Sequence, residues 1–166
     1  MKRFLLIALS LIAVVGCSDK TKSAKSKFIY DYKSSFKFEK TINIVKNSLK
    51  NKNYQPVFEF NHEKEALKLK QMLYPTVTIE LNNPKISTKL ISCNPTIAQD
   101  LPIRVAVYNE INGQTHVSFT DPEYWSLKHN IKDSECINLL FVIKNDLEEL
   151  AKEVTKKWSH RKLFKL

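Results

Sequence analysis

Three prolines within one short segment place the strongest constraint on how this chain can fold. Residues 82–104 read NNPKISTKLISCNPTIAQDLPIR, with prolines at positions 84, 95 and 102. The residue before a proline is disfavoured in the helical region of backbone space. We therefore predict that no single regular element runs through this segment and that it is built turn by turn between two strands. Irregular backbone held between strands often leaves polar groups free for a ligand.

The pattern of apolar residues on both sides of this segment predicts an α+β fold. Alternating or short apolar runs predict strands, and apolar residues three and four apart predict helices. The order strand, helix, strand, helix, three strands, helix indicates one mainly antiparallel sheet with helices packed on one face. We expect strands over 36–38, 54–60, 76–81, 101–110 and 114–120, and helices over 41–50, 62–73 and 134–158, with a short helical turn over 123–129.

Two asparagines and a proline set the ends of the expected helices. Asn53 is placed to end the first helix in a left-handed conformation. Asn61 can cap the second helix, and Pro75 follows that helix. We expect the second helix to turn Ala66, Leu69 and Leu73 inward, and the last helix, capped by Ser134, to bury the stripe Leu140, Ile143, Leu147, Leu150, Val154 and Trp158.

The turn containing Gly113 fixes the register of the hairpin formed by residues 101–120. A three-residue loop, 111–113, places Val107 opposite Val117 and Val105 opposite Phe119, whereas a two-residue turn mixes apolar and polar faces. That loop needs a left-handed residue at its third position, where Gly113 stands. The opposite face of the hairpin then carries Arg104, Ala106, Tyr108, His116 and Ser118.

The N-terminus has the pattern of a bacterial lipoprotein signal peptide. Lys2 and Arg3 precede an apolar run over residues 4–15, which is shorter than the ~20 residues of a membrane span. The sequence Val14-Val15-Gly16-Cys17 follows and resembles a lipobox. We expect residues 1–16 to be a signal peptide and Cys17 to be lipidated. An uncleaved N-terminal anchor with a chance cysteine is the alternative.

Residues 18–35 are rich in lysine and serine, and we expect residues 17–35 to be a tether on which Phe28, Ile29, Tyr30 and Tyr32 could dock. The folded domain then spans 36–158, and residues 159–166 form a basic tail. The lipid anchor makes the membrane a partner of the protein. The residue directly after Cys17 is Ser18, and the aspartate is one position later, at Asp19. This order slightly favours the outer membrane over the inner membrane for a periplasm-facing lipoprotein.

Composition excludes several classes of function. The chain has only two glycines, which excludes a glycine-rich phosphate loop. Its formal charge is +10, but export argues against nucleic acid as the partner. No histidine pair at helical spacing and no Cys-x-x-Cys motif is present in the sequence, so we expect no metal and no cofactor. Cys93 and Cys136 could form a disulfide, but we favour two small buried apolar residues.

Several motifs in one order resemble the bacterial family known as domain of unknown function 302. They are Asn61-His62, Asn83-Pro84-Lys85, Thr88, Pro95, Asp100-Leu101-Pro102, Arg104, Gly113, Phe119, Asp121-Pro122 and Lys128-His129, spread over roughly residues 36–158. The resemblance implies a fold similar to the α+β sheet of the TATA-binding protein. Asn82 and Ser87 stand where the family has glycines, and Asn61 replaces an aspartate. The family has no established reaction, so the resemblance implies none.

The polar residues at the family positions are the candidate ligand-binding residues: His62, Asn83, Lys85, Thr88, Asp100, Arg104 and His129. If they line one cleft, it is a mildly basic pocket suited to an anionic ligand. The ordinary alternatives are structural histidines and ion pairs among Lys85, Asp100 and Arg104, and we favour these. The sequence thus predicts an envelope lipoprotein that binds a small ligand or an envelope protein without catalysis. The other hypothesis is a periplasmic enzyme with His62 or His129 as general base.

Overall fold

The computed structural model describes residues 27–156. The predicted lipobox with Cys17, the start of the tether, Trp158 and the basic tail lie outside the described residues. The elements in chain order are β1 (Ile29–Lys33), α1 (Phe38–Lys50), β2 (Gln55–Asn61), α2 (His62–Lys68), β3 (Thr76–Asn82), α3 (Pro84–Cys93), the 3-10 helix η1 (Pro95–Gln99), β4 (Ile103–Asn109), β5 (Thr115–Thr120), α4 (Pro122–Lys128) and α5 (Ser134–Thr155).

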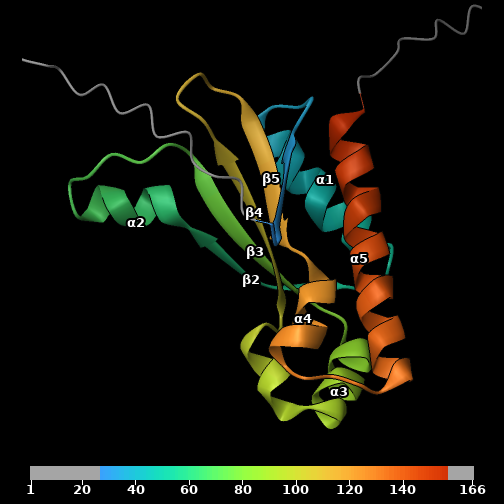
Figure 1. The fold of residues 1–166 in the computed structure, drawn as a ribbon. Helices are drawn as coiled ribbons and strands as arrows, with labels where there is room; N and C mark the ends of the chain where they lie inside the picture. Colours follow the sequence, from blue (N-terminus) through green and yellow to red (C-terminus); the bar gives the residue numbers. More distant parts are fainter. Residues whose placement is uncertain (1–26, 157–166) are drawn as a thin grey trace, which may run out of the picture.

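One five-stranded antiparallel sheet organises the domain, in the order β1-β5-β4-β3-β2. Helices α1 and α5 lie side by side against one face of this sheet (Figure 1). The strands alternate so that apolar residues such as Val77, Ile79 and Val105 are buried beneath these helices. Burial of this apolar surface is the main stabilising contribution to the fold. The predicted α+β class with a single antiparallel sheet is confirmed.

The β4–β5 hairpin has the predicted register. Val105 is opposite Phe119 and Val107 is opposite Val117. Gly113 has a φ of +80°, the left-handed region that a three-residue loop requires at its third place. The opposite face carries Arg104, Ala106, Tyr108, His116 and Ser118, also as predicted.

The first strand lies earlier than predicted. Residues 29–33 form β1 and pair with β5 at the edge of the sheet, within the segment expected to be a tether. Tyr30 and Tyr32 alternate inward and lie 5.8 Å from the ring of Phe119. The prediction of a strand at Phe36 and Phe38 is wrong, because Phe38 begins α1 after an extended N-cap. The aromatic residues thus dock on the domain, and the domain starts before residue 36.

The proline-rich segment is more regular than predicted. Asn83 and Asn94 are N-caps whose side chains accept hydrogen bonds from the backbone N–H groups of Ile86 and Thr96. Pro84 and Pro95 then occupy the first position of α3 and of η1. A proline is tolerated there because the first helical N–H has no intrahelical partner. The two Asn-Pro steps therefore start helices instead of preventing them, and the expectation of a turn-by-turn segment is wrong over residues 84–99.

Helix α2 is shorter than predicted. Asn61 caps it as expected, through a 2.9 Å bond from the N–H of Lys64 to its side-chain oxygen. The helix ends at Lys68, and Lys70 has a φ of +56°. Ala66 is buried, but Leu69 and Leu73 are 72% and 52% exposed, so the prediction that they point inward is wrong. No element among residues 27–156 covers these two side chains.

The last helix has the predicted buried stripe from Leu140 to Val154. Its N-cap is Asp133, whose carboxylate accepts the N–H of Cys136, and not the expected Ser134. The short helical turn before it is α4. Among residues 27–156, no helix is long and apolar enough to cross a membrane.

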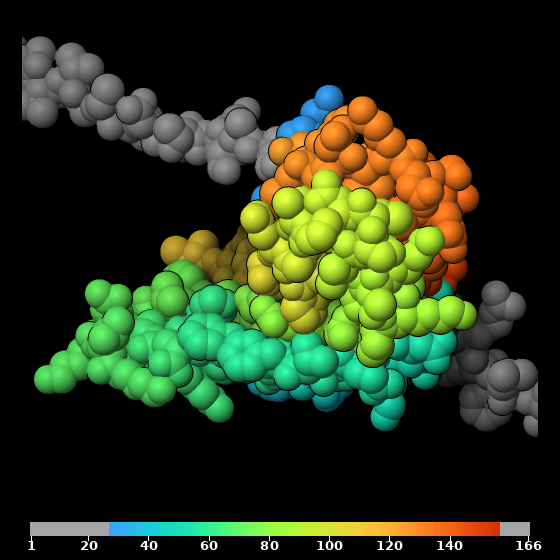
Figure 2. All heavy atoms as spheres, turned by 90° about the horizontal axis from the view of Figure 1, so that it is seen from below, coloured from blue at the N-terminus to red at the C-terminus, as the bar shows by residue number. Residues whose placement is uncertain are grey.

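The two ends of the sheet differ in how they are covered. Helices α3 and α4 and the start of α5 gather at the end where β3 stops and β4 begins (Figure 1). At the other end, the last residues of β2 and all of α2 extend away from the packed body, and Figure 2 shows this segment in teal and green reaching beyond the other coloured residues.

Candidate functional site

A groove lies between α3, the turn after α1 and the first half of α5. Its volume is about 510 Å³, within the range of roughly 300–1,000 Å³ that is usual for small-molecule sites. Its lining consists of apolar, basic and acidic side chains from these three segments: Lys52, Asn53, Asn83, Lys85, Ile86, Lys89, Glu135, Leu139, Val142 and Asp146. The groove joins residues that are far apart in the sequence.

The spacing of the lining residues follows from helix geometry. Glu135, Leu139, Val142 and Asp146 are separated by four, three and four positions, so they form one stripe along α5. This stripe runs beside the buried stripe that begins at Leu140. With a rise of ~1.5 Å per residue, it spans about 16 Å of the helix. The long wall of the groove is therefore a half-exposed face of α5.

A disulfide holds α3 against α5 near one end of the groove. The sulfur atoms of Cys93 and Cys136 are bonded, and their Cα atoms are 6.7 Å apart. Our preference for two free, buried cysteines is wrong, because the C-terminus of α3 lies against the N-terminus of α5 and brings the thiols together. An ion pair of 2.7 Å between Lys89 and Glu135 crosses the same two helices. It raises the pKa of Lys89 above its ordinary value.

A buried tyrosine and a carboxylate close the other end. The hydroxyl of Tyr54 donates to Asp146 over 3.1 Å, and Lys52 lies 3.0 Å from the other oxygen of that carboxylate. Burial, followed by the adjacent Asp146 charge, raises the pKa of Tyr54 well above its ordinary value. Hydrogen bonds to Glu149 and Asp146 raise the pKa of Lys52. Because both pKa values are raised, Tyr54 stays neutral and Lys52 stays charged across the physiological range.

One of the three lysines that line the groove has no carboxylate partner among the described residues. Lys52 and Lys89 are engaged with carboxylates, but Lys85 is exposed and forms no ion pair with any residue between 27 and 156. Three lysines and two carboxylates give the lining a formal charge of +1. Ile86, Leu139 and Val142 provide the apolar part of the lining, and Val142 is 44% exposed. The groove therefore offers an apolar surface beside an available ammonium group.

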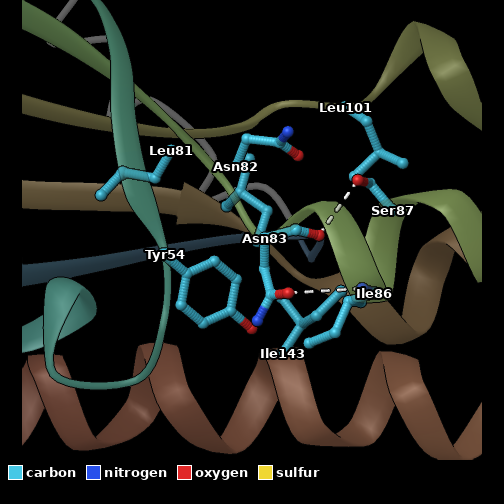
Figure 3. Close-up of a pocket in the computed structure, with 9 residues that line it drawn as sticks. Tyr54, Leu81, Asn82, Asn83, Ile86, Ser87, Leu101 and Ile143 are labelled. Atoms are coloured by element: carbon cyan, nitrogen blue, oxygen red, sulfur yellow. Dashed lines mark hydrogen bonds between the residues drawn. The ribbon is translucent and has the colours of Figure 1, made fainter.

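A second, much smaller cavity lies behind the groove and shares Asn83 and Ile86 with it (Figure 3). Its volume is about 10 Å³, which is the space needed by about one water molecule. The figure shows the side-chain oxygen of Asn83 directed at the N–H of Ile86 and the hydroxyl of Ser87 directed at the Asn83 carbonyl, bonds of 3.4 and 3.0 Å. These bonds form the start of α3, so this cavity is part of the scaffold of the groove.

The seven residues predicted to bind a ligand do not line one cleft. Only Asn83 and Lys85 line the groove. Thr88 is exposed on α3. His62 follows Asn61, which pairs with Val77 at one end of β3, whereas Asp100 precedes β4 at the opposite end, where Ile103 pairs with Leu81. His62 and His129 thus lie near opposite ends of the sheet, because His129 contacts Asp100.

His129 is held by three side chains of the segment from 94 to 100. Its Nδ1 lies 2.9 Å from the hydroxyl of Thr96, its Nε2 lies 2.5 Å from Asp100, and its carbonyl accepts from Asn94. The residue is 4% exposed. Both ring nitrogens therefore have protein partners, which favours the structural interpretation over a general base.

Asp100 also forms an ion pair with a lysine of α4. Lys128 lies 2.8 Å from the Asp100 carboxylate. Burial by itself raises the pKa of Asp100, but the hydrogen bonds from Lys128 and His129 outweigh it and hold the pKa below its ordinary value of 3.8. The partner of Asp100 is thus Lys128 and not the predicted Lys85 or Arg104.

His62 and Arg104 lie on the face of the sheet opposite α1 and α5. His62 Nε2 is 2.9 Å from the hydroxyl of Thr78, and its ring packs edge-on against Phe60 at 4.8 Å. Arg104 pairs with Glu80 over 3.0 Å. These contacts cross neighbouring strands and stabilise the sheet locally.

The sequence contained a signal for the groove that the prediction did not use. The stripe Glu135, Leu139, Val142 and Asp146 has helical spacing but mixes charged and apolar residues, and a prediction based on apolar periodicity assigns it to solvent. The sequence alone does not show that this stripe lies near Lys52, Tyr54 and Lys89. Their proximity depends on how α1, α3 and α5 pack against one another.

Comparison with known proteins shows to which family the chain belongs. The family model described as "Domain of unknown function DUF302" matches residues 30–159. The chain belongs to the DUF302 family. A solved structure, that of an uncharacterized conserved DUF302 protein from Bacillus stearothermophilus, superposes with a TM-score of 0.70 at 22% sequence identity, covering 78% of this chain and 99% of that chain. No curated protein matches the chain.

The DUF302 match extends from within β1 to just beyond α5, so it includes the edge strand that sequence reasoning assigned to the tether. At this level of identity, the solved relative shows that the fold is shared. The groove, the disulfide and the His129 contacts are observations on this chain.

Among residues 27–156, Cys93, Asp133 and Cys136 are the one group with atoms close enough to hold a metal ion together. Their two sulfurs are bonded to each other. A metal would need both as thiolates, so the oxidised form of the group does not fit a metal ion.

Proposed function

We propose that this protein is a lipid-anchored protein of the cell envelope whose domain binds a small amphipathic anion in the groove between α3 and α5. The observation that carries the proposal is the pairing of an apolar lining with the unpaired Lys85 in a groove of about 510 Å³. An apolar lining with few polar groups is the usual composition of a ligand site. A carboxylate or phosphate group would lie at Lys85, with an apolar chain along Leu139 and Val142.

The disulfide supports the envelope part of the proposal. Disulfides persist in oxidising compartments and are rare in the cytosol. A Cys93–Cys136 bond is therefore consistent with export directed by the N-terminal lipobox pattern, which ends at Cys17. Outer-membrane sorting, slightly favoured by the position of Asp19, is part of the same proposal.

The enzymatic alternative has weaker support. His129 has no ring nitrogen available to a substrate, since Thr96 and Asp100 occupy both. His62 has one nitrogen bonded to Thr78, and neither histidine lines the groove. A general base must reach the proton that it removes. We therefore favour binding over catalysis.

Binding of decanoate and of decyl phosphate to the chain from Ser18 onward can be measured by isothermal titration calorimetry. We expect Lys85→Glu to weaken binding of both ligands at least tenfold, because a repulsive charge replaces an attractive one (about 1.4 kcal/mol). Val142→Asp should have a similar effect by placing a charge on the apolar wall.

The matched control is Lys64→Glu, an equal change of charge on the exposed face of α2, far from the groove. It should leave the affinity unchanged. Equal weakening by Lys64→Glu would show that the ligands respond to net charge alone, and no binding by the unaltered chain would refute an amphipathic anion as ligand.

The envelope part has its own test. Cys17→Ala should leave the protein without palmitate labelling and outside the membrane fraction. If the variant still labels and fractionates with membranes, the lipoprotein proposal is wrong.

A further inference from the structure

The segment from β2 through α2 to the start of β3 exposes more large apolar side chains than any other part of the described chain. We name residues 57–74 the arm. Eight of the fifteen exposed large apolar side chains among the described residues lie on it: Val57 53%, Phe58 53%, Phe60 37%, Leu67 59%, Leu69 72%, Met72 93%, Leu73 52% and Tyr74 52%. Nothing else in the described chain covers them.

The exposed area on the arm matches one half of a protein interface. Side chains of these sizes and exposed fractions present roughly 800 Å², and a standard interface takes about 800 Å² from each partner. Monomeric proteins rarely expose apolar patches above a few hundred Å². The arm projects from the body (Figure 2), so a partner can reach it without displacing another element.

The arm has local contacts of its own. Asn61 caps α2, and Glu65 pairs with Lys68. Phe58 and Phe60 alternate along β2, and with His62 at the start of α2 they form a row of rings, with Phe58 6.1 Å from Phe60. Rigid aromatic side chains of this kind are common at the centre of interfaces.

The charges on the arm favour a second copy of the same chain as the partner. Glu63 and Glu65 alternate with Lys64, Lys68 and Lys70, so the charged side chains have mixed signs. In a symmetric dimer the same patch meets itself, and a surface of one sign would repel its copy. An anionic membrane would favour a strongly basic stripe, which the arm lacks.

The backbone edge of β2 is protected from simple strand addition. Pro56 removes one donor, the pairing with β3 is irregular between Pro56 and Phe58, and Glu59 carries a charge. These features discourage pairing of one edge strand with another. The partner must therefore contact the arm through side chains.

We infer that the arm is a homodimer interface, in which the apolar side chains of α2 and of the loop after it pack against the arm of a second copy. This inference is independent of the groove, because no arm residue lines it. It also gives the exposed Leu69 and Met72 a role that the monomer does not.

The test is sedimentation equilibrium of the full mature chain in a density-matched detergent. The unaltered chain should sediment as a dimer at micromolar concentration. Leu69→Asp with Met72→Asp should weaken association at least tenfold. The matched control is Ile111→Asp with Leu127→Asp, which changes two side chains that are 81% and 78% exposed outside the arm. It should remain dimeric.

In solutions dilute enough to make both proteins monomeric, circular dichroism should show the same melting temperature for the arm variant and for the control variant. This measurement distinguishes a loss of association from a loss of folding. A monomeric unaltered chain, or equal weakening by the control pair, would overturn the inference. So would a Met72→Trp variant whose added fluorescence, relative to the unaltered chain, is quenched by brominated lipid in vesicles of phosphatidylglycerol and phosphatidylethanolamine, because the arm would then contact lipid.

Discussion

At one end of the sheet, α3, η1, α4 and the start of α5 are joined by a disulfide, by the ion pair of Lys89 with Glu135 and by the bonds of His129. At the other end, α2 buries only Ala66 and leaves Leu69 and Met72 in solvent. We call the first region the braced end. Both regions contain a capped helix beside a strand, so local helix chemistry does not account for the difference.

The comparison teaches that the two regions obtain their order from different sources. The braced end is stabilised by contacts between elements distant in sequence, such as the bonds of His129 with Thr96 and Asp100. The arm depends on its cap and on the strands from which it extends, so its apolar side chains are available to another molecule. A ligand groove suits the first region because its walls are fixed, and an interface suits the second.

Removing the disulfide should lower the free energy of unfolding more than any other change proposed for the two regions. Replacing both Cys93 and Cys136 with serine should lower the free energy of unfolding by about 4 kcal/mol, since the bond closes a loop with a sequence separation of 43. Urea denaturation measures the loss. Reductant should destabilise the unaltered chain by the same amount and leave the double variant unchanged. A difference well below 1 kcal/mol would mean that other contacts brace this end.

A pair of leucines gives a direct comparison of the two regions. Leu90 in α3 is 0% exposed, and Leu69 at the end of α2 is 72% exposed. Leu90→Ala should cost about 3 kcal/mol because it opens a cavity. Leu69→Ala should cost less than about 0.5 kcal/mol in solutions dilute enough to hold the chain monomeric. Thermal and urea unfolding measure both, and similar costs at the two positions would refute the contrast.

The carboxylate of Asp100 should show a smaller, pH-dependent effect. Its pKa is lowered in the folded state, so its contribution is complete above the ordinary value of 3.8 and is lost as the pH falls below that value through the lower folded pKa. Asp100→Asn should therefore cost about 1.5–3 kcal/mol at neutral pH, the scale of hydrogen bonds to a charged group.

The cost of Asp100→Asn should shrink as the pH is lowered below 3.8, because the carboxylate of the unaltered protein then becomes protonated too. Urea titrations of both proteins at several pH values measure this. Leu69→Ala on the arm removes no titratable group, so it is the control, and its cost should show no such narrowing. A cost independent of pH would mean that the charge of Asp100 does not stabilise the braced end.

Local chemistry determined much of this protein directly from the sequence. The hairpin register follows from the alternation of Val105 and Val107 with polar neighbours and from Gly113, because a slip by one residue exposes an apolar face. Asn61 was recognised as a cap, and Asn53 has the expected left-handed conformation with a φ of +66°. These features depend on contacts within a few residues, which a sequence displays.

The Asn-Pro steps show how one local signal can be read in two ways. A proline ends a helix that arrives from before it but suits the first position of a helix that follows it. The capping side chains of Asn83 and Asn94 favour the second case, in which the proline begins a helix. The sequence therefore contained α3 and η1, and the interpretation of the prolines as breaks concealed them.

Tertiary packing alone decided which residues line the groove and which side chains of the arm stay exposed. Cys93 meets Cys136, and Lys85 shares a groove with Val142, only because α3 docks on α5. Leu69 and Leu73 have the same local spacing as buried leucines, yet no layer of the domain lies over them. Apolar periodicity states which face of a helix seeks burial. Whether another element lies against that face depends on the path of the whole chain, and for the arm we assign the covering layer to a second molecule.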